Sequence, residues 1–144
     1  MTTLMHEILI EAPVEAVWAA LADLEAVQHY NPMVASARCV SDRREGVGAT
    51  RRCEFRPGGS AAERVTEWSP GRAMAMEAFE HPWPMQSVRW RNELVAEGGA
   101  TRLTQELHYQ PTGDPEMAAA MESQWDQGIR AVFAGLKTYL EAQR

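Results

Sequence analysis

The stretch GVGATRRCEFRPGGSAAERVTEW, residues 46–68, has the pattern of two short strands joined by a tight turn. The Pro-Gly-Gly run at residues 57–59 is a strong turn signal, because proline restricts φ and glycine tolerates positive φ. A turn there folds the strands back on each other and places Arg51 opposite Glu63, to within one residue. The stretch therefore predicts an antiparallel hairpin with a charged pair across its strands.

The residues alone leave two interpretations of this charged pair open. Alternation along the first strand puts Arg51 on one face with Cys53 and Phe55. On the returning strand, Glu63 shares its face with Val65. A face with Phe55 and Val65 belongs in an interior, where the two charges must pair or contact water. The alternative is an exposed cross-strand pair worth at most about 1 kcal/mol, with Phe55 at the surface.

On both sides of the hairpin, short runs of residues separated by turn signals extend over residues 34–110. Ser-Pro-Gly at residues 69–71 and Gly-Gly at residues 98–99 mark two of these turns. Short connections favour neighbouring antiparallel strands. The region therefore predicts a meander of six strands, at residues 34–41, 48–55, 60–68, 72–80, 86–97 and 100–110.

The chain before this meander predicts one strand followed by two short helices. Residues 4–11 alternate imperfectly, as expected of a strand. Residues 14–30 carry apolar side chains at helical spacing, and Asp23 divides them into two segments. Asn-Pro at residues 31–32 then ends the second helix.

The C-terminal segment predicts one long helix. Asp114 suits the N-cap, Pro115 the first helical position and Glu116 the first turn. A helix of about 25 residues rises roughly 1.5 Å per residue, so it is long enough to lie across the sheet. Its apolar stripe consists of Met117, Met121, Trp125, Gly128, Val132, Leu136 and Leu140, widened by Ile129, Phe133 and Tyr139.

Four stretches, in their order along the chain, together resemble the SRPBCC/START-like helix-grip superfamily, which includes START domains, the birch-pollen-allergen fold and polyketide cyclase/dehydrase-like proteins. They are IEAPVEAVWAALADLEAVQHYNP near the start, GVGATRR with ERVTEW in the middle, and LKTYLEA at the end. The resemblance covers essentially the whole chain. It implies an α+β helix-grip fold, in which a curved antiparallel sheet of about seven strands wraps around the C-terminal helix, with two short helices after strand 1. It also implies a cavity between sheet and helix, where members hold lipids, sterols, polyketides or hormones and a minority catalyse reactions.

Length and charge narrow the class of protein. A chain of 144 residues is most simply a single domain, residues 1–144. The formal net charge of −6 and the scattered basic residues argue against a nucleic-acid partner. No secretion signal and no run of about 20 apolar residues is visible, so we expect a cytoplasmic protein without an integral membrane segment. We expect a monomer or homodimer.

The cysteines and histidines indicate no metal or other cofactor. Cys39 and Cys53 are too few and too far apart for a metal site, and we expect both to be small buried residues in strands. No two histidines have metal-ligand spacing. We expect His6 in the core or at its rim, His29 near a cavity mouth, His81 in a loop, and His108 exposed.

Residues on the expected inner faces form the candidate ligand-binding set, although simple core packing is an alternative for each. In the helix, Gly128 either makes room for a ligand or admits a close strand. The stiff His-Pro-Trp-Pro run at residues 81–84 either caps the cavity entrance or is a plain turn. The candidate set is Arg51, Cys53, Phe55, Glu63, Val65, Met74, Met76, Trp90, Gln105, Leu107, Tyr109, Met121, Trp125 and Gly128.

The preferred functional hypothesis is a binding module for a small, largely hydrophobic molecule that is lipid-, polyketide- or aromatic-like. Arg51 and Glu63 would orient a polar end of that molecule. The alternative is an enzyme of the polyketide cyclase/dehydrase or aromatase type, with Arg51, Glu63 and Tyr109 or a histidine in acid–base roles. It is less favoured because no triad or metal motif is present. A third hypothesis is an interaction with a partner protein through the cavity rim.

Overall fold

The computed structural model describes residues 1–143, which form one seven-stranded sheet and three helices. The order of elements is the one that the sequence predicts, including the meander of six strands. In chain order they are β1 (Thr2–Ile10), α1 (Val14–Ala22), α2 (Val27–Tyr30), β2 (Val34–Cys39), β3 (Thr50–Phe55), β4 (Ser60–Ser69), β5 (Ala73–Glu80), β6 (Met85–Glu97), β7 (Ala100–Pro111) and α3 (Pro115–Glu141).

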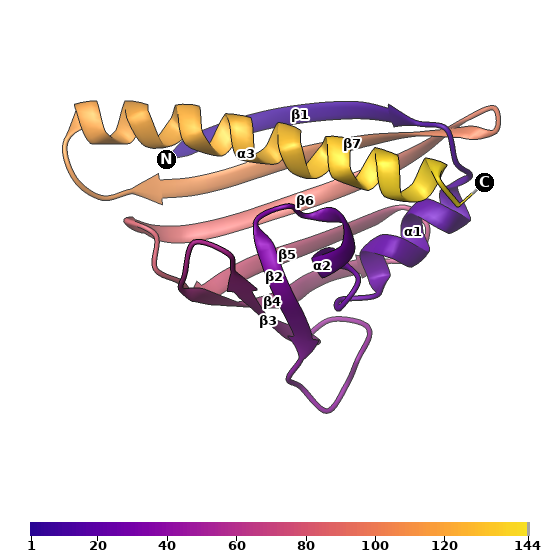
Figure 1. Cartoon of the computed structure of the whole chain (residues 1–144), viewed down its shortest axis with the longest axis horizontal. Coiled ribbons are helices and arrows are strands. Elements are labelled where there is room, and N and C mark those ends of the chain that lie inside the picture. Colours follow the sequence, from indigo (N-terminus) through magenta and orange to yellow (C-terminus); the bar gives the residue numbers. More distant parts are fainter. Residues whose placement is uncertain (144) are drawn as a thin grey trace.

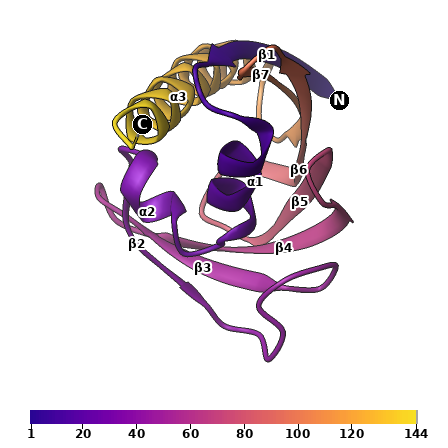
Figure 2. The ribbon, with the colours of Figure 1, turned by 90° about the vertical axis from the view of Figure 1, so that its right-hand side faces the viewer.

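The sheet is antiparallel throughout and curves strongly. Its strand order is β1-β7-β6-β5-β4-β3-β2, so the first strand lies beside the last. Figure 1 shows α3 running along the sheet close to β1 and β7. In the end-on view of Figure 2 the sheet has a C-shaped section, with α3 across the opening between its β1 and β2 edges. This α+β helix-grip architecture confirms the predicted fold class.

The start of α3 follows its sequence signals. The Asp114 side chain caps the helix by accepting a hydrogen bond from the Met117 backbone N–H at 2.8 Å, and Pro115 occupies the first turn. The helical spacing predicts that Met117 begins the apolar stripe, but its side chain is 54% exposed. Met117 is exposed because the first turn of α3 projects past the end of β7, as Figure 1 shows. The buried stripe begins one turn later, at Met121.

The two short helices close one end of the sheet. Helix α1 packs against α3, β6 and β7, and α2 packs against α3 and β2. The contact between α2 and α3 requires a glycine, because a Cβ at Gly135 would overlap the backbone carbonyl oxygen of Tyr30. A sheet bent around a straight helix cannot contact it along its whole length, so a hollow remains beyond the two short helices.

Candidate functional site

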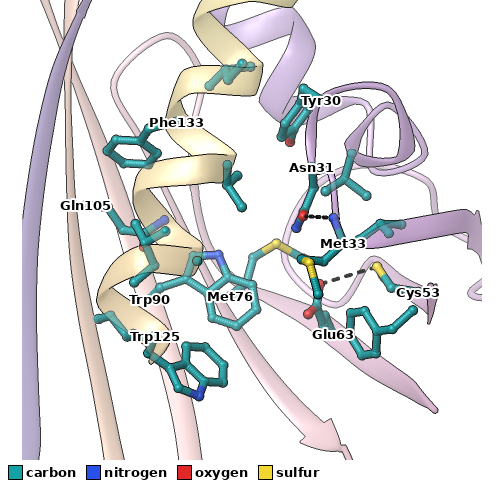
Figure 3. Close-up of a pocket in the computed structure, with 18 of the residues that line it drawn as sticks. Tyr30, Asn31, Met33, Cys53, Glu63, Met76, Trp90, Gln105, Trp125 and Phe133 are labelled. Atoms are coloured by element: carbon teal, nitrogen blue, oxygen red, sulfur yellow. Dashed lines mark hydrogen bonds between the residues drawn. The ribbon is translucent and has the colours of Figure 1, made fainter. Parts of the chain in front are cut away.

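The hollow between α3 and the concave face of the sheet is a cavity of about 790 Å³. This volume lies within the range of roughly 300–1,000 Å³ that small-molecule pockets occupy. Strands β2 to β7 and all three helices contribute to its lining. Figure 3 shows side chains from the sheet and from α3 converging on this space.

Most of the candidate ligand-binding set lies in the cavity lining. Gly128 faces open space, since a Cβ there would have no heavy atom within 4 Å. The lining members of the set are Arg51, Cys53, Phe55, Glu63, Met74, Met76, Trp90, Gln105, Leu107, Trp125 and Gly128.

Three members of the set lie outside the lining, and each has a structural reason. Val65 sits farther along β4, where its backbone bonds to Gly48 and Ala49 and its side chain fills the core. Trp125 stacks on Tyr109, with ring centroids 6.0 Å apart, and covers it. Met121 lies one helical turn before Trp125, beyond the part of α3 that faces the cavity. We therefore leave Val65, Tyr109 and Met121 out of the proposed site.

Arg51 and Glu63 form an ion pair inside the protein. They are direct partners across β3 and β4, as the hairpin predicts, and Nε of Arg51 donates to Oε1 of Glu63 at 2.8 Å. Their side chains are only 8% and 9% exposed. Nη1 of Arg51 also donates to the Leu24 carbonyl at 3.4 Å. The alternative of an exposed surface pair is therefore wrong.

The protonation states around this pair follow from burial. Burial alone would lower the pKa of Arg51, but the Glu63 carboxylate raises it above its ordinary value, so the guanidinium stays charged. Burial raises the pKa of the Cys53 thiol to about 12, and Glu63 adds to the effect. Burial likewise raises the pKa of the Tyr30 hydroxyl, although the charge of Arg51 opposes this. On this wall of the cavity, the opposite charges of the ion pair therefore cancel, and the Cys53 thiol and the Tyr30 hydroxyl beside it are neutral.

A second polar feature lies on the strands at the other side of the concave face. Asn92 on β6 and Gln105 on β7 are direct register partners. Nε2 of Gln105 donates to Oδ1 of Asn92 at 3.0 Å. Both side chains line the cavity, and Asn92 is buried. The two amides therefore partly satisfy each other in a mainly apolar setting.

Aromatic side chains form another part of the wall. Trp83, in the loop between β5 and β6, meets the edge of Trp125 with ring centroids 4.9 Å apart. Phe55 lies 5.5 Å from Trp83, and His81 stacks on its ring at 5.1 Å. Pro82 and Trp83 both line the cavity. The loop at residues 81–84 therefore contributes to the cavity wall and is more than a plain turn.

Several lining residues are not in the candidate set. Asn92 lies between Trp90 and Leu94 on the same face of β6, so strand alternation was a sufficient signal for it. Tyr30 ends α2, and neither periodicity nor spacing shows which way a residue at the end of a four-residue helix points. Figure 3 shows Tyr30 near the α3 side of the cavity. Phe133 belongs to the predicted helix stripe but is not singled out by it as a wall residue.

The cysteines and histidines differ in their burial and in their contacts. Cys53 is buried as predicted, whereas Cys39 is only half-buried because it ends β2 beside Ser41. His6 is buried and its Nε2 lies 2.7 Å from Oδ1 of Asp126. His29 stacks on Tyr139, with ring centroids 6.0 Å apart, and is not in the cavity lining.

The sequence predicts an exposed His108, but the residue is half-buried. Its Nε2 lies 2.6 Å from Oε1 of Glu106, and its Nδ1 lies 3.0 Å from the Thr3 hydroxyl. Across residues 1–143, His, Cys, Asp and Glu side chains form no group of three that could hold a metal ion. Among the same residues, no helix has the length and apolar character needed to cross a membrane.

Comparison with solved structures supports the same fold. A crystal structure of a protein from Thermus thermophilus is 21% identical, with a TM-score of 0.83, and the match covers 99% of each chain. A solution structure of a protein from Thermobifida fusca is 22% identical, with a TM-score of 0.81, and covers 97% of this chain and 93% of that one. The protein XoxI from Bacillus cereus is 14% identical, with a TM-score of 0.77, covering 100% of this chain and 99% of that one.

No curated protein sequence matches this chain. A family model, however, matches it over residues 1–141, and that family is described as polyketide cyclase / dehydrase and lipid transport. Because the match spans nearly all of the chain and agrees with its helix-grip fold, the chain belongs to the polyketide cyclase/dehydrase and lipid transport family.

Proposed function

We propose that the cavity binds a small, largely apolar molecule, lipid-, polyketide- or aromatic-like, whose polar end contacts Arg51 and Glu63. The observation that carries this proposal is the 790 Å³ space between sheet and α3. Apolar walls supply affinity, at about 25 cal/mol per Å² of buried apolar surface, and a few placed polar groups orient the ligand. We also propose that the protein acts in the cytoplasm as a single domain.

The charge state of the polar wall favours a ligand without net charge at that end. Arg51 and Glu63 already neutralise each other at 2.8 Å, so an added ion would lack a free counter-charge. Tyr30 and Cys53 stay protonated, and a hydroxyl or carbonyl group can exchange hydrogen bonds with them. A phenol, alcohol or ketone fits this wall better than a carboxylate.

The test compares two variants that add a phenylalanine to the same helix. Gly128→Phe places a ring in the cavity, where a Cβ meets no heavy atom within 4 Å. Ala131→Phe adds the same ring at an exposed position of α3. Titration with the neutral fluorophore 1-aminoanthracene should show saturable enhancement for the wild type and for Ala131→Phe, and binding of Gly128→Phe should be weaker by about tenfold or more, or some 1.4 kcal/mol. Equal binding by all three proteins would place the fluorophore outside the cavity and count against the proposal.

The alternative is a cyclase/dehydrase- or aromatase-like enzyme, favoured by one observation. The same cavity wall holds a neutral Tyr30 hydroxyl and the Glu63 carboxylate, which are a proton donor and a proton acceptor. Against it, Glu63 is already held by Arg51 and Cys53. A molecule extracted from the purified protein separates the two functions. A binder returns it unchanged, whereas a dehydrating enzyme converts it to a product lacking one water, and Tyr30→Phe should stop that conversion without abolishing binding.

A further inference from the structure

The Asn92–Gln105 pair stands on a sheet face that is otherwise mainly apolar. Its neighbours on β6 are Trp90 and Leu94, and on β7 they are Leu103 and Leu107. In register, the pair continues a cross-sheet row that runs from Met74 on β5 through Asn92 and Gln105 to His6 on β1. Leucines at both amide positions would pack this face without leaving polar groups to satisfy.

The pair leaves a defined hydrogen-bonding surface. Each amide has one carbonyl oxygen and one NH₂ group, and the single bond between them uses one donor and one acceptor. What remains is the NH₂ group of Asn92, the second N–H of Gln105 and the carbonyl oxygen of Gln105. If both amides were reversed, the roles would exchange, but N–H donors and one carbonyl acceptor would still be left for a ligand. The chemistry of the surface is therefore independent of which amide donates.

This surface lies apart from the ion pair. Arg51 is on β3 and Asn92 on β6, three strands away in the sheet order. At about 4.8 Å per strand this is roughly 14 Å along the sheet, and Glu63 on β4 is one strand nearer to Asn92. The direct path across the bowl is shorter. Among the described residues that line the cavity, only Arg51 and Glu63 carry charge. Met74 and Met76 lie on β5, between the ion pair and the amide pair. A ligand that spans the cavity thus meets polar groups on two separate walls.

We propose that Asn92 and Gln105 recognise a neutral donor–acceptor group of the ligand, of the carboxamide or lactam class, at the end away from Arg51. This inference rests on the proposed binding function and specifies its ligand. A carboxamide returns one donor and one acceptor to the pair. An ester supplies only acceptors and leaves the Gln105 carbonyl unpaired, whereas a carboxylate faces that carbonyl with a negative charge.

Two matched probes test this assignment by isothermal titration calorimetry: 6-hydroxy-2-naphthamide and methyl 6-hydroxy-2-naphthoate. Both carry a phenol for the ion-pair wall, and they differ only in carboxamide against methyl ester. The wild type should bind the carboxamide about tenfold more tightly than the ester, because the ester leaves the Gln105 carbonyl without a hydrogen-bond donor. In Asn92→Leu/Gln105→Met the two affinities should agree within about twofold, with ester binding retained. Removing both amides leaves no unpaired partner, so the double variant should melt at or above the wild-type temperature.

The outcomes separate this inference from the proposed function. Equal binding of both probes by the wild type, abolished by Gly128→Phe, overturns the carboxamide assignment and leaves the binding function standing. Discrimination that survives in the double variant also overturns the assignment. If neither probe binds to the folded wild type, the carboxamide assignment and the proposed binding function are both overturned. If the double variant does not fold, Gln105→Met alone serves, and unchanged discrimination in it contradicts the assignment.

Discussion

At the scale of residues, we expect substitutions in the ion pair between Arg51 and Glu63 to change the free energy of unfolding most. Removing one partner leaves the other charge buried and uncompensated, which destabilises a protein by about 3–5 kcal/mol. Arg51→Met and Glu63→Leu should each lower the free energy of unfolding by that amount. The double variant should recover most of the loss, because apolar side chains of similar volume replace both charges.

Urea unfolding of the wild type, the two single variants and the double variant measures this coupling. The control is the exposed pair of Arg64 and Glu77, whose removal should cost no more than about 1 kcal/mol. Single Arg51 or Glu63 variants that lose as little as this control would show that water reaches the buried pair.

The two cysteines should differ in reactivity. The pKa of Cys53 is raised to about 12 and its side chain is 1% exposed, so almost no thiolate is present or accessible at mildly alkaline pH. Cys39 is half-buried at the end of β2. Ellman's reagent should therefore label one thiol quickly in the native protein and the second only after denaturation. The Cys39→Ser variant should show no fast phase, and a fast phase in that variant would contradict the burial of Cys53.

At the scale of elements, α3 contains two glycines with opposite roles. Gly128 lowers the intrinsic stability of the helix by up to about 1 kcal/mol relative to alanine, and a Cβ there would enter open space. Gly128→Ala should therefore stabilise the protein by about 0.5–1 kcal/mol. Gly135→Ala should instead destabilise it by roughly 1–3 kcal/mol, because its Cβ would overlap the Tyr30 carbonyl and force α2 and α3 apart.

Thermal or urea unfolding of these matched variants checks the contrast within one helix. Ligand affinity should fall for Gly128→Ala in spite of its higher stability, since the added methyl group narrows the cavity. Destabilisation by Gly128→Ala would mean that the helix face at this position is already in contact with the sheet.

The contact between β1 and α3 should depend on pH. Arg130 lowers the pKa of the Asp126 carboxyl, and the hydrogen bond with His6 lowers it further. A carboxyl whose pKa is lowered by folding stabilises the native state above its unfolded pKa of about 3.9, and this contribution is lost as the pH falls through the folded value. Asp126→Asn should therefore lower the urea midpoint at about pH 7 but not at roughly pH 2–3. Asp42→Asn, at an exposed loop position, is the control; an equal effect of Asp126→Asn at both pH values would exclude this charge linkage.

At the scale of the whole molecule, the elements were predictable because their signals are local. The turn at residues 57–59 and the cap at Asp114 depend on neighbouring residues only, and both lie where expected. The register of Arg51 and Glu63 followed from the turn. The curvature of the sheet and the depth of the cavity depend on contacts between distant strands. They were therefore predicted from the resemblance to the helix-grip superfamily and not from any local sequence pattern.

The same distinction explains where the candidate set and the cavity lining differ. Strand alternation assigns a face correctly, but it does not say how far along the strand the cavity extends. Val65 and Tyr109 are both on inner faces and fill the core, but Val65 lies farther along β4 than the cavity reaches and Tyr109 lies behind Trp125. Tyr30 lies on the wall because α2 docks against Gly135, a contact between elements about a hundred residues apart that no local pattern encodes.

One sheet gripping one helix should unfold as a single cooperative unit, with the cavity inside it. Calorimetry should show one transition with equal calorimetric and van't Hoff enthalpies, as expected of a single domain of 144 residues. A cavity ligand at about 1,000 times its Kd adds about 4 kcal/mol of stability, which raises the midpoint by roughly 10–15 °C. The whole transition should move, because the lining draws on β2 to β7 and on all three helices. A second transition that does not respond to the ligand would show that part of the chain folds independently of the cavity, and it would contradict the single-domain proposal.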